Sequence, residues 1–376
     1  MAGKTSGGSG ELIRWLGVAS LPCVLAVGFA AAGGWLSPHR VTPDTLLAAL
    51  QGVDGTHPGF RRNHAKGVCV SGWFEGNGQA ASYSPAFAFD SKRVPVIGRF
   101  ALAGGMPYQG DAPGKVRSMA LALKGPDGQE WRMGLNDIPV FPVSTPQEFQ
   151  ALQQAVRPLE GTGKPDPLAV RTFRAAHPWL ASAGKALADR PITSGFENDT
   201  YRSLDSFVLH GADGRSTAMR FAMVPEEQKF ADLPGRGENA SFDQLDEAVS
   251  AHPLRWTLVL TLAGAGDAVN DPSRIWSAQD RQIAAGTLTL TRLASEKEGD
   301  CTGITFDPLI LPEGVAASDD PVLQARSATY MRSFAERSRE KRPRPAFDPA
   351  VSPGGKTDEK SGATPGSESA SPEKAS

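Results

Sequence analysis

Apolar and polar residues alternate along several stretches of this chain, a pattern typical of half-buried β-strands. Residues 256–262 keep strict period two, and Leu288 and Leu290 repeat the pattern among threonines. Shorter alternating stretches cover residues 68–74, 119–123, 131–133, 207–209 and 219–221. Turn sequences such as Gly125-Pro126-Asp127-Gly128 separate consecutive stretches, which favours antiparallel pairing. Six or more strands of this kind predict a β-barrel.

Signals for helix starts are interspersed with these strands. Thr145-Pro146-Gln147-Glu148 is a capping box with proline at the first helical position. Thr42-Pro43, Asp166-Pro167 and Asp320-Pro321 also place a capping residue before a proline. They predict helices that start near residues 43, 146, 167 and 321, the third of which reaches about residue 187. The expected fold class is therefore α+β, an antiparallel barrel with surrounding helices.

Residues 15–36 form an uncharged, mainly apolar run that follows Lys4 and Arg14. The run is 22 residues long, enough for one transmembrane helix. The positive charges before the run predict that the N-terminus stays on the cytoplasmic side of the membrane and that the main body lies on the other side. The small residues Ala30-Ala31-Ala32 leave a cleaved signal peptide as the alternative. Both interpretations predict a folded body in the periplasm, anchored to the inner membrane where the segment is retained.

Composition sets the domain limits and excludes some partners. Residues 1–14 and 341–376 are rich in glycine, serine, proline or charge, so we expect disordered ends around one folded domain at 42–340. A formal net charge of -2 and a pI of about 6.3 argue against a nucleic-acid partner. Three cysteines exclude a disulfide scaffold. A Cys69–Cys301 bridge requires an oxidising compartment and is the less favoured interpretation.

Two segments carry the candidate chemistry. Near the end of the chain, Arg326, Tyr330 and Arg337 fall at helical spacing and share one face. A tyrosinate can hold haem iron, and a guanidinium one turn away can stabilise the anion by a charge-assisted hydrogen bond. Near the start, His64 and Arg61 offer a general base beside a cation. Taken alone, the segment at 326–337 is more simply explained as a helix packed on the core, and His64 as a structural histidine.

Further segments between these two change that balance, because the whole set stands in a defined order along the chain. They are Arg61-x-x-His64-Ala65-Lys66-Gly67, Gly72-Trp73-Phe74-Glu75, Arg99-Phe100, Leu135-Asn136-Asp137-Ile138-Pro139-Val140-Phe141, Phe149, Ile275-Trp276, Phe306-Asp307-Pro308 and the stretch from Ser318 through Arg326 to Tyr330. Together, from about residue 58 to residue 337, the set resembles the haem catalase superfamily, and specifically its short catalase-related peroxidases.

The resemblance implies a catalase-like barrel that binds haem b, with Tyr330 as the axial ligand of the iron. It implies that His64 and Asn136 are the catalytic pair on the opposite side of the ring, where His64 moves the peroxide proton and Asn136 donates a hydrogen bond. The implied cofactor-binding residues are Arg61, Arg99, Phe141, Phe149, Arg326, Tyr330 and Arg337. Arginines 61, 99 and 337 match positions that pair with haem propionates, and Arg326 would bond the Tyr330 phenolate.

Four positions depart from the family pattern. Ala101 stands where catalases have a serine that bonds the distal histidine, so we expect His64 to lose one orienting partner. Asn63 should sit near the ring face, and Ser118 replaces an acidic residue of the access channel. Asp205 stands where many relatives have a histidine, and we expect it to pair with Arg326.

The function that the resemblance implies is reduction of hydrogen peroxide and organic hydroperoxides by a small organic donor, with weak catalase activity, in the defence against peroxide stress. One alternative within the same fold is a hydroperoxide isomerase or dehydratase acting on lipid hydroperoxides. Another alternative is a non-catalytic haem-binding protein of the cell envelope. We expect a monomer or a small homo-oligomer.

Overall fold

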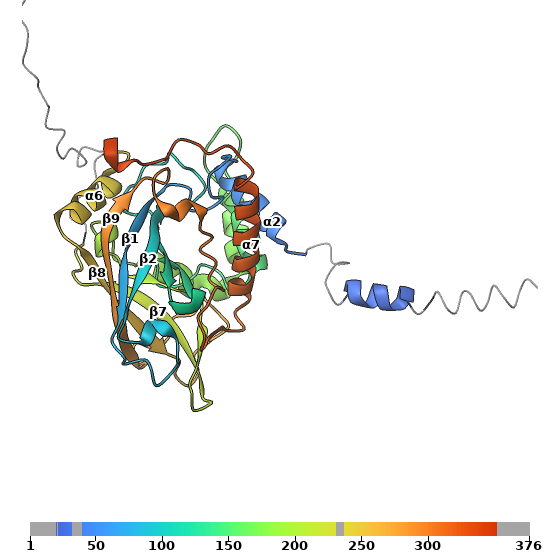
Figure 1. Cartoon of the computed structure of the whole chain (residues 1–376). Coiled ribbons are helices and arrows are strands. Elements are labelled where there is room, and N and C mark those ends of the chain that lie inside the picture. Colours follow the sequence, from blue (N-terminus) through green and yellow to red (C-terminus); the bar gives the residue numbers. More distant parts are fainter. Residues whose placement is uncertain (1–19, 21, 32–39, 231–236, 352–376) are drawn as a thin grey trace, which may run out of the picture.

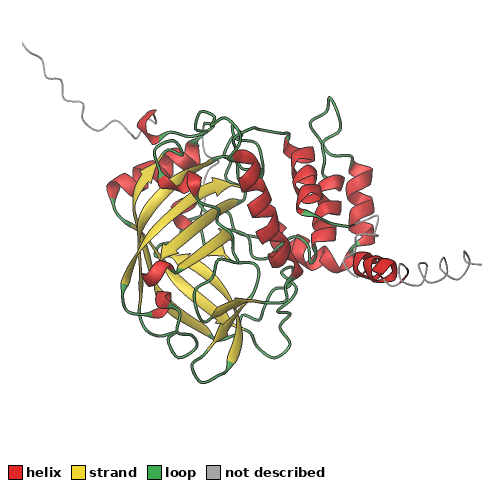
Figure 2. Ribbon diagram, turned by 45° about the vertical axis from the view of Figure 1, so that its right-hand side comes forward, coloured by secondary structure: helices red, strands yellow, loops and turns green. Residues whose placement is uncertain are grey.

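The computed structural model describes residues 20, 22–31, 40–230 and 237–351. Its centre is a closed antiparallel barrel of eight strands, drawn in yellow in Figure 2. In order around the barrel they are β1 (Gly67–Gly76), β2 (Arg93–Leu102), β3 (Arg117–Lys124), β4 (Glu130–Asn136), β5 (Tyr201–Arg202), β7 (Ser216–Pro225), β8 (Leu254–Leu262) and β9 (Gln282–Ala294). Pairing of β9 with β1 closes the ring. Two short strands, β6 (Phe207–His210) and β10 (Val315–Ala317), extend it beside β7.

The interior of the barrel is filled by the apolar set of each strand, as the period-two pattern predicts. Trp256, Leu258 and Leu260 of β8 are fully buried, and the residues between them are only partly buried. Phe100 of β2 contacts the ring of Trp256 at a centroid distance of 5.8 Å and the ring of Tyr201 at 5.7 Å. These contacts join opposite parts of the barrel, so the predicted antiparallel barrel is confirmed.

Helices gather mainly on one side of the barrel (Figures 1 and 2). They are α2 (Pro43–Asp54), α3 (Pro146–Ala155), α4 (Pro167–Ala176), α5 (Ala181–Ala188), α6 (Ala240–Ala251) and α7 (Pro321–Arg337). The predicted capping box is present at α3, where the Thr145 hydroxyl accepts a hydrogen bond from the Glu148 backbone N–H. Asp320 caps α7 by accepting hydrogen bonds from Val322 and Leu323. The predicted starts of α2, α3, α4 and α7 are therefore confirmed.

Two helical predictions need correction. The single helix expected from residue 167 to about 187 is broken into α4 and α5 at His177-Pro178. Proline lacks a backbone N–H and disfavours helical geometry in the residue before it, which explains the break. Helix α6 was not expected, although Asn239 ahead of it is a residue type that often precedes a helix; in the structure it makes no side-chain cap. The helix lies on the barrel against β9.

The structure tests only part of what was predicted for the two ends of the chain. Half of the predicted membrane segment at 15–36 and all of residues 1–14 lie outside the described residues. Among the described residues, none belongs to a helix that is both long and apolar enough to span a bilayer. At the other end, the ordered body continues past the expected limit at residue 340. Phe347 is 4% exposed and stacks on Phe242 of α6 at 5.2 Å, so at least residues 341–347 pack against the body.

Cys69 and Cys301 form a disulfide, which corrects the expectation that they stay unpaired. The bond ties β1 to the short 3-10 turn η5 (Asp300–Gly303), 232 residues further along the chain. Both sulfurs are buried together with Ala122 and Phe306. Sequence spacing carries no information on such a distant pairing, because only the barrel places the turn beside the strand.

Candidate active site

One cavity brings together the whole set of predicted site residues. It lies between strands β3 and β4 of the barrel wall and helices α2 and α7, and its volume is about 1200 Å³ including the opening to solvent. The predicted residues that line it are Arg61, His64, Arg99, Asn136, Phe141, Phe149, Arg326, Tyr330 and Arg337. The histidine from the start of the chain and the tyrosine from the last helix therefore face a common space, although 266 residues separate them in the sequence.

His64 is held in a backbone conformation that is uncommon for residues other than glycine. Its φ angle is 57°, in the left-handed region, which costs a non-glycine residue roughly 1–3 kcal/mol. The Asn63 side-chain oxygen accepts hydrogen bonds from the backbone N–H of His64 at 2.9 Å and of Gly104 at 2.8 Å. Asn63 lines the cavity as expected, but its oxygen is used to clamp this turn rather than to meet a ring face. The clamp stabilises the strained conformation that aims the imidazole.

The His64 ring has a partner that the sequence analysis did not foresee. Ser118 Oγ lies 2.9 Å from His64 Nδ1 and donates to the carbonyl oxygen of Ala101 at 3.2 Å. When the hydroxyl proton goes to Ala101, His64 Nδ1–H donates to Ser118 Oγ. In that arrangement Nε2 is unprotonated and can act as a base. Ala101 and Ser118 are directly paired across β2 and β3, so the serine missing at position 101 is replaced from the adjacent strand.

Replacing Ser118 by alanine should slow peroxide cleavage by about 10- to 100-fold, because the imidazole loses the hydrogen-bond partner that orients it. The rate of reaction with hydrogen peroxide, followed by stopped-flow absorbance, is the measurement. The double variant Ala101→Ser/Ser118→Ala is the matched control, since it returns a hydroxyl from the paired position. Recovery of the rate is expected in the double variant, and a full rate in Ser118→Ala would contradict the role.

The imidazole stays neutral over the physiological pH range. Burial lowers the pKa of His64 to about 3, and the nearby charges of Arg99, Arg326 and Arg61 act in the same direction. A neutral imidazole is the form that can accept a proton, so His64 is ready to act as a base without a prior deprotonation step.

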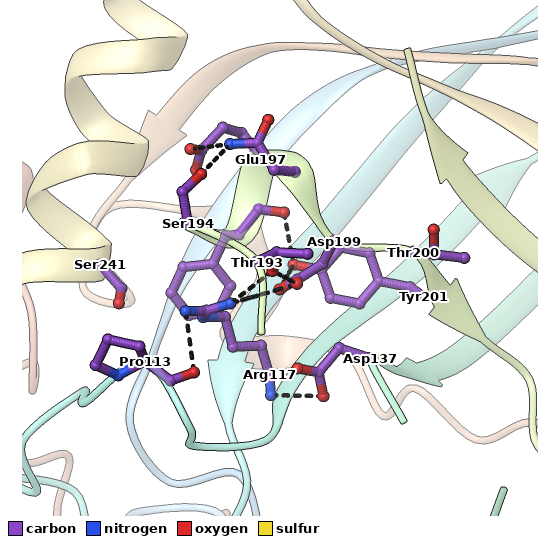
Figure 3. A network of polar contacts seen from close by, with 12 residues as sticks. Pro113, Arg117, Asp137, Thr193, Ser194, Glu197, Asp199, Thr200, Tyr201 and Ser241 are labelled. Atoms are coloured by element: carbon purple, nitrogen blue, oxygen red, sulfur yellow. Dashed lines mark hydrogen bonds and ion pairs between the residues drawn. The ribbon is translucent and has the colours of Figure 1, made fainter. Parts of the chain in front are cut away.

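Asn136 ends β4 directly opposite Ser118 of β3. On the neighbouring positions, Arg117 N–H donates to Asp137 at 3.0 Å, and the Arg117 guanidinium pairs with buried Asp199 at 3.1 Å. Figure 3 shows this network, which ties the ends of both strands to the segment before β5. It fixes the backbone positions from which Ser118 and Asn136 reach the cavity.

A buried ion pair supports the tyrosine on the other side of the cavity. Arg326 forms a salt bridge with Asp205, and its Nη2 lies 3.0 Å from the Gly134 carbonyl oxygen and 3.4 Å from Tyr330 Oη. Although burial opposes it, Asp205 and then Tyr330 hold the pKa of Arg326 above its ordinary value. A Cβ atom at Gly134 would lie 2.9 Å from Arg326 Nη2, so glycine leaves the space that this contact needs. The predicted Asp205–Arg326 pair is thus present.

Asp205→Ala should remove the counter-charge of a buried guanidinium, which costs roughly 3–5 kcal/mol when no partner replaces it. We expect a lower melting temperature and a changed haem absorption spectrum, because Arg326 is then free to reorient at Tyr330. Asp205→Asn keeps an acceptor and should fall between the variant and the wild type. An unchanged spectrum in Asp205→Ala would show that the pair does not act on the tyrosine.

Three arginines supply an excess of positive charge to the cavity. Burial lowers the pKa of Arg61, and the charges of Arg99 and Arg337 lower it further. Glu296 offsets part of this charge through its ion pair with Arg99 at 2.8 Å. Arg61 Nε and Arg337 Nη2 are buried without a hydrogen-bond partner among the described residues. The ionised propionates of a haem would supply the missing acceptors and negative charge, so the residues present fit that group.

Apolar side chains complete the walls of the cavity. Phe141 and Phe149 stack at a centroid distance of 5.7 Å with an interplanar angle of 28°, and both line the cavity. Leu46, Leu47 and Leu50, the buried face of α2, close it from outside the barrel. The start of α2 was predicted from the sequence, but the cavity that its leucines cover was not.

The chain matches the Catalase family model over residues 46–341. It is 34% identical to a catalase-related peroxidase of Synechococcus elongatus over 87% of this chain and 97% of that protein. It is 32% identical to a catalase-related peroxidase of Mycolicibacterium paratuberculosis, over 78% of this chain and 94% of that protein. A catalase of Rattus norvegicus is 26% identical over 71% of this chain but only 54% of its own length.

Solved structures show the same fold. A fungal catalase superposes with a TM-score of 0.67 at 20% identity, covering 75% of this chain and 60% of that one. Catalase A of Saccharomyces cerevisiae superposes with a TM-score of 0.66 at 18% identity, covering 80% and 64%. This chain therefore spans somewhat less than two thirds of these larger proteins. The family match, the related sequences and the shared barrel lead to one conclusion: this chain belongs to the catalase family of oxidoreductases, together with the short catalase-related peroxidases.

Proposed function

We propose that this protein is a haem b peroxidase that reduces hydrogen peroxide and organic hydroperoxides with a small organic donor, evolves oxygen only weakly, and protects the cell from peroxide stress. The observation that carries the proposal is the shared cavity, in which the His64 and Tyr330 side chains face one space. A protein that only binds haem has no need for a neutral imidazole held beside a serine hydroxyl in the same cavity. Each turnover consumes one hydroperoxide, two electrons and two protons, and yields one alcohol and one water.

On the distal side, His64 Nε2 accepts the proton of the bound hydroperoxide and returns it to the departing oxygen. Ser118, 2.9 Å from the opposite ring nitrogen, accepts a hydrogen bond from Nδ1–H during both steps of this mechanism. The Asn136 amide, on the same cavity wall, can donate a hydrogen bond to the oxygen on which charge develops. The backbone clamp at Asn63 holds the imidazole in place while the proton moves.

On the proximal side, Tyr330 is the residue that would hold the haem iron, and Arg61, Arg99 and Arg337 would hold its propionates. Haem would supply the redox chemistry that breaks the oxygen–oxygen bond, and an anionic ligand from the protein would favour that cleavage. The positive charge of Arg326 would stabilise Tyr330 as that anion, while buried Asp205 keeps the arginine in position.

We also propose that the body works outside the cytoplasm, anchored through the segment at 15–36 or released when that segment is cleaved. The support is the buried Cys69–Cys301 disulfide, since stable disulfides are typical of oxidising compartments such as the periplasm. Cell fractionation followed by non-reducing electrophoresis tests this placement. Recovery of the protein in the cytosol with both thiols free would contradict it.

The test of the activity compares three reactions of the purified haem protein. Cumene hydroperoxide with a neutral phenol should give steady donor oxidation and cumyl alcohol. Hydrogen peroxide alone should give slow oxygen release on an oxygen electrode. A lipid hydroperoxide alone should give no rearranged product by mass spectrometry. Fast oxygen release without donor oxidation would make the protein a catalase instead, and rearranged lipid products would make it an isomerase.

A further inference from the structure

A second cavity adjoins the first at the end of α7. Arg61 and Arg337 line both cavities, so two guanidinium groups form part of the wall between them. The second cavity has a volume of about 480 Å³ including its opening to solvent. We call it the strap pocket, because residues 342–345, which follow α7 and cross back over the barrel in Figure 1, form one of its walls.

The strap is a built part of the fold rather than a loose end. The Arg344 carbonyl oxygen accepts a hydrogen bond from Tyr108 at 3.3 Å, and Phe347 is buried against α6. At its start, a Cβ atom at Gly59 would lie only 2.4 Å from the Lys341 carbonyl oxygen, so the strap passes close over that turn. These contacts hold the basic side chains of the strap over the pocket.

The charge of the strap pocket is strongly positive. Its charged lining consists of Arg61, Glu296, Lys297, Arg337, Arg342 and Arg344. Five basic groups against one carboxylate leave a surplus of four positive charges, and Glu296 is already paired with Arg99. Two ionised haem propionates would neutralise only about half of this surplus. Within the described part of the chain, no ion pair engages Lys297, Arg342 or Arg344.

One buried donor stands on the wall shared with the main cavity, where a haem propionate on one side or an anion in the strap pocket on the other would satisfy it. Arg337 is 8% exposed, its Nη1 donates to the Thr302 carbonyl oxygen at 2.9 Å, and its Nη2 has no partner among the described residues. Burial, followed by the charges of Arg99 and Arg342, lowers the pKa of Arg337 to about 10. A guanidinium in this environment is stabilised by any anion that reaches it.

We propose that the strap pocket is the docking site for the electron donor, and that the donor it favours is a small anionic reductant. This inference rests on the proposed peroxidase function and names the substrate class of its second half-reaction. Lys297 and Arg342 attract the anionic group at the mouth, while Arg61 and Arg337 separate the bound donor from the main cavity by the width of their side chains. Two hydroquinone-type donors each lose one electron and one proton, and these reduce one hydroperoxide to one alcohol and one water.

The experiment uses the haem-loaded full chain and a matched pair of donors. Hydroquinone and hydroquinonesulfonate share a redox core and differ by one negative charge. The test variant is Lys297→Glu/Arg342→Glu, and the control variant is Lys164→Glu/Arg171→Glu. The control reverses two exposed basic residues that line neither cavity.

We expect kcat/KM for hydroquinonesulfonate to fall about tenfold or more in the test variant, mainly through KM, and to fall with ionic strength in the wild type. The value for hydroquinone should stay within about twofold in both variants. In the absence of peroxide, calorimetric titration should show hydroquinonesulfonate binding to the resting wild type and control, weakened about tenfold in the test variant.

Equal losses of kcat/KM for both donors in the test variant would contradict the proposed docking site. Unchanged binding and turnover of hydroquinonesulfonate in that variant would contradict it as well. Failure of the wild type to oxidise either donor, with sulfonate binding intact, would instead overturn the proposed peroxidase function. The two failures are therefore distinguishable.

Discussion

Tyr330→Phe is expected to lose turnover and haem retention by on the order of a hundredfold or more, because removal of a direct ligand should exceed the 10- to 100-fold cost of losing an outer partner. The substitution removes one oxygen atom from a side chain that lines the cavity 3.4 Å from Arg326. It leaves Arg326 with its buried partner Asp205, so the fold should survive. The measurement is the absorption spectrum and the haem-to-protein ratio after gel filtration.

Tyr83→Phe is the matched control for this variant. Tyr83 is partly buried at the barrel and lies outside the cavity, with the guanidinium of Arg281 over its ring. It should keep a wild-type spectrum and full activity. If Tyr330→Phe retained haem with the same ferric spectrum as the control, the iron ligand would have to be another residue and the assignment of α7 would be wrong.

His64→Asn is expected to slow peroxide cleavage by about 10²- to 10⁴-fold while haem binding persists, since general base catalysis contributes that much. Asparagine is chosen because it tolerates the left-handed backbone of this position better than alanine does. An amide cannot accept a proton at these pH values. His210→Asn, an exposed histidine bonded to Ser216, is the control. The measurement is the stopped-flow rate constant with hydrogen peroxide.

The pH profile gives an independent check on the same residue. Burial, reinforced by Arg99, lowers the pKa of His64 to about 3, so its basic form persists as the pH falls through the ordinary imidazole value of about 6.5. The wild-type rate constant should therefore show no acid limb between pH 8 and about 5 from this group. A loss of rate centred near 6.5 in wild type, absent in a variant that lacks His64, would contradict the environment described for the imidazole.

The sequence determined the elements whose signals are local. Period-two alternation in residues 256–262 and the capping residues ahead of α3 and α7 depend on neighbours within a few positions, so they could be predicted from the chain alone. The i, i+4 spacing of Arg326 and Tyr330 has the same origin. Residue types by themselves left His64 and Tyr330 as candidates. It was the ordered resemblance to a family that joined them into one predicted site.

The tertiary structure decided the contacts that join distant segments. The Ser118–His64 hydrogen bond depends on the register between β2 and β3, which places Ser118 opposite Ala101. The Cys69–Cys301 bond and the basic strap depend on where chain segments return to the barrel. A one-residue change in register would turn the Ser118 side chain away, and a linear pattern does not encode the register of strands that meet only on folding. For that reason the sequence alone indicated most helix starts and the residues that carry the chemistry, while partners such as Ser118 and Cys301 were decided by the closed barrel.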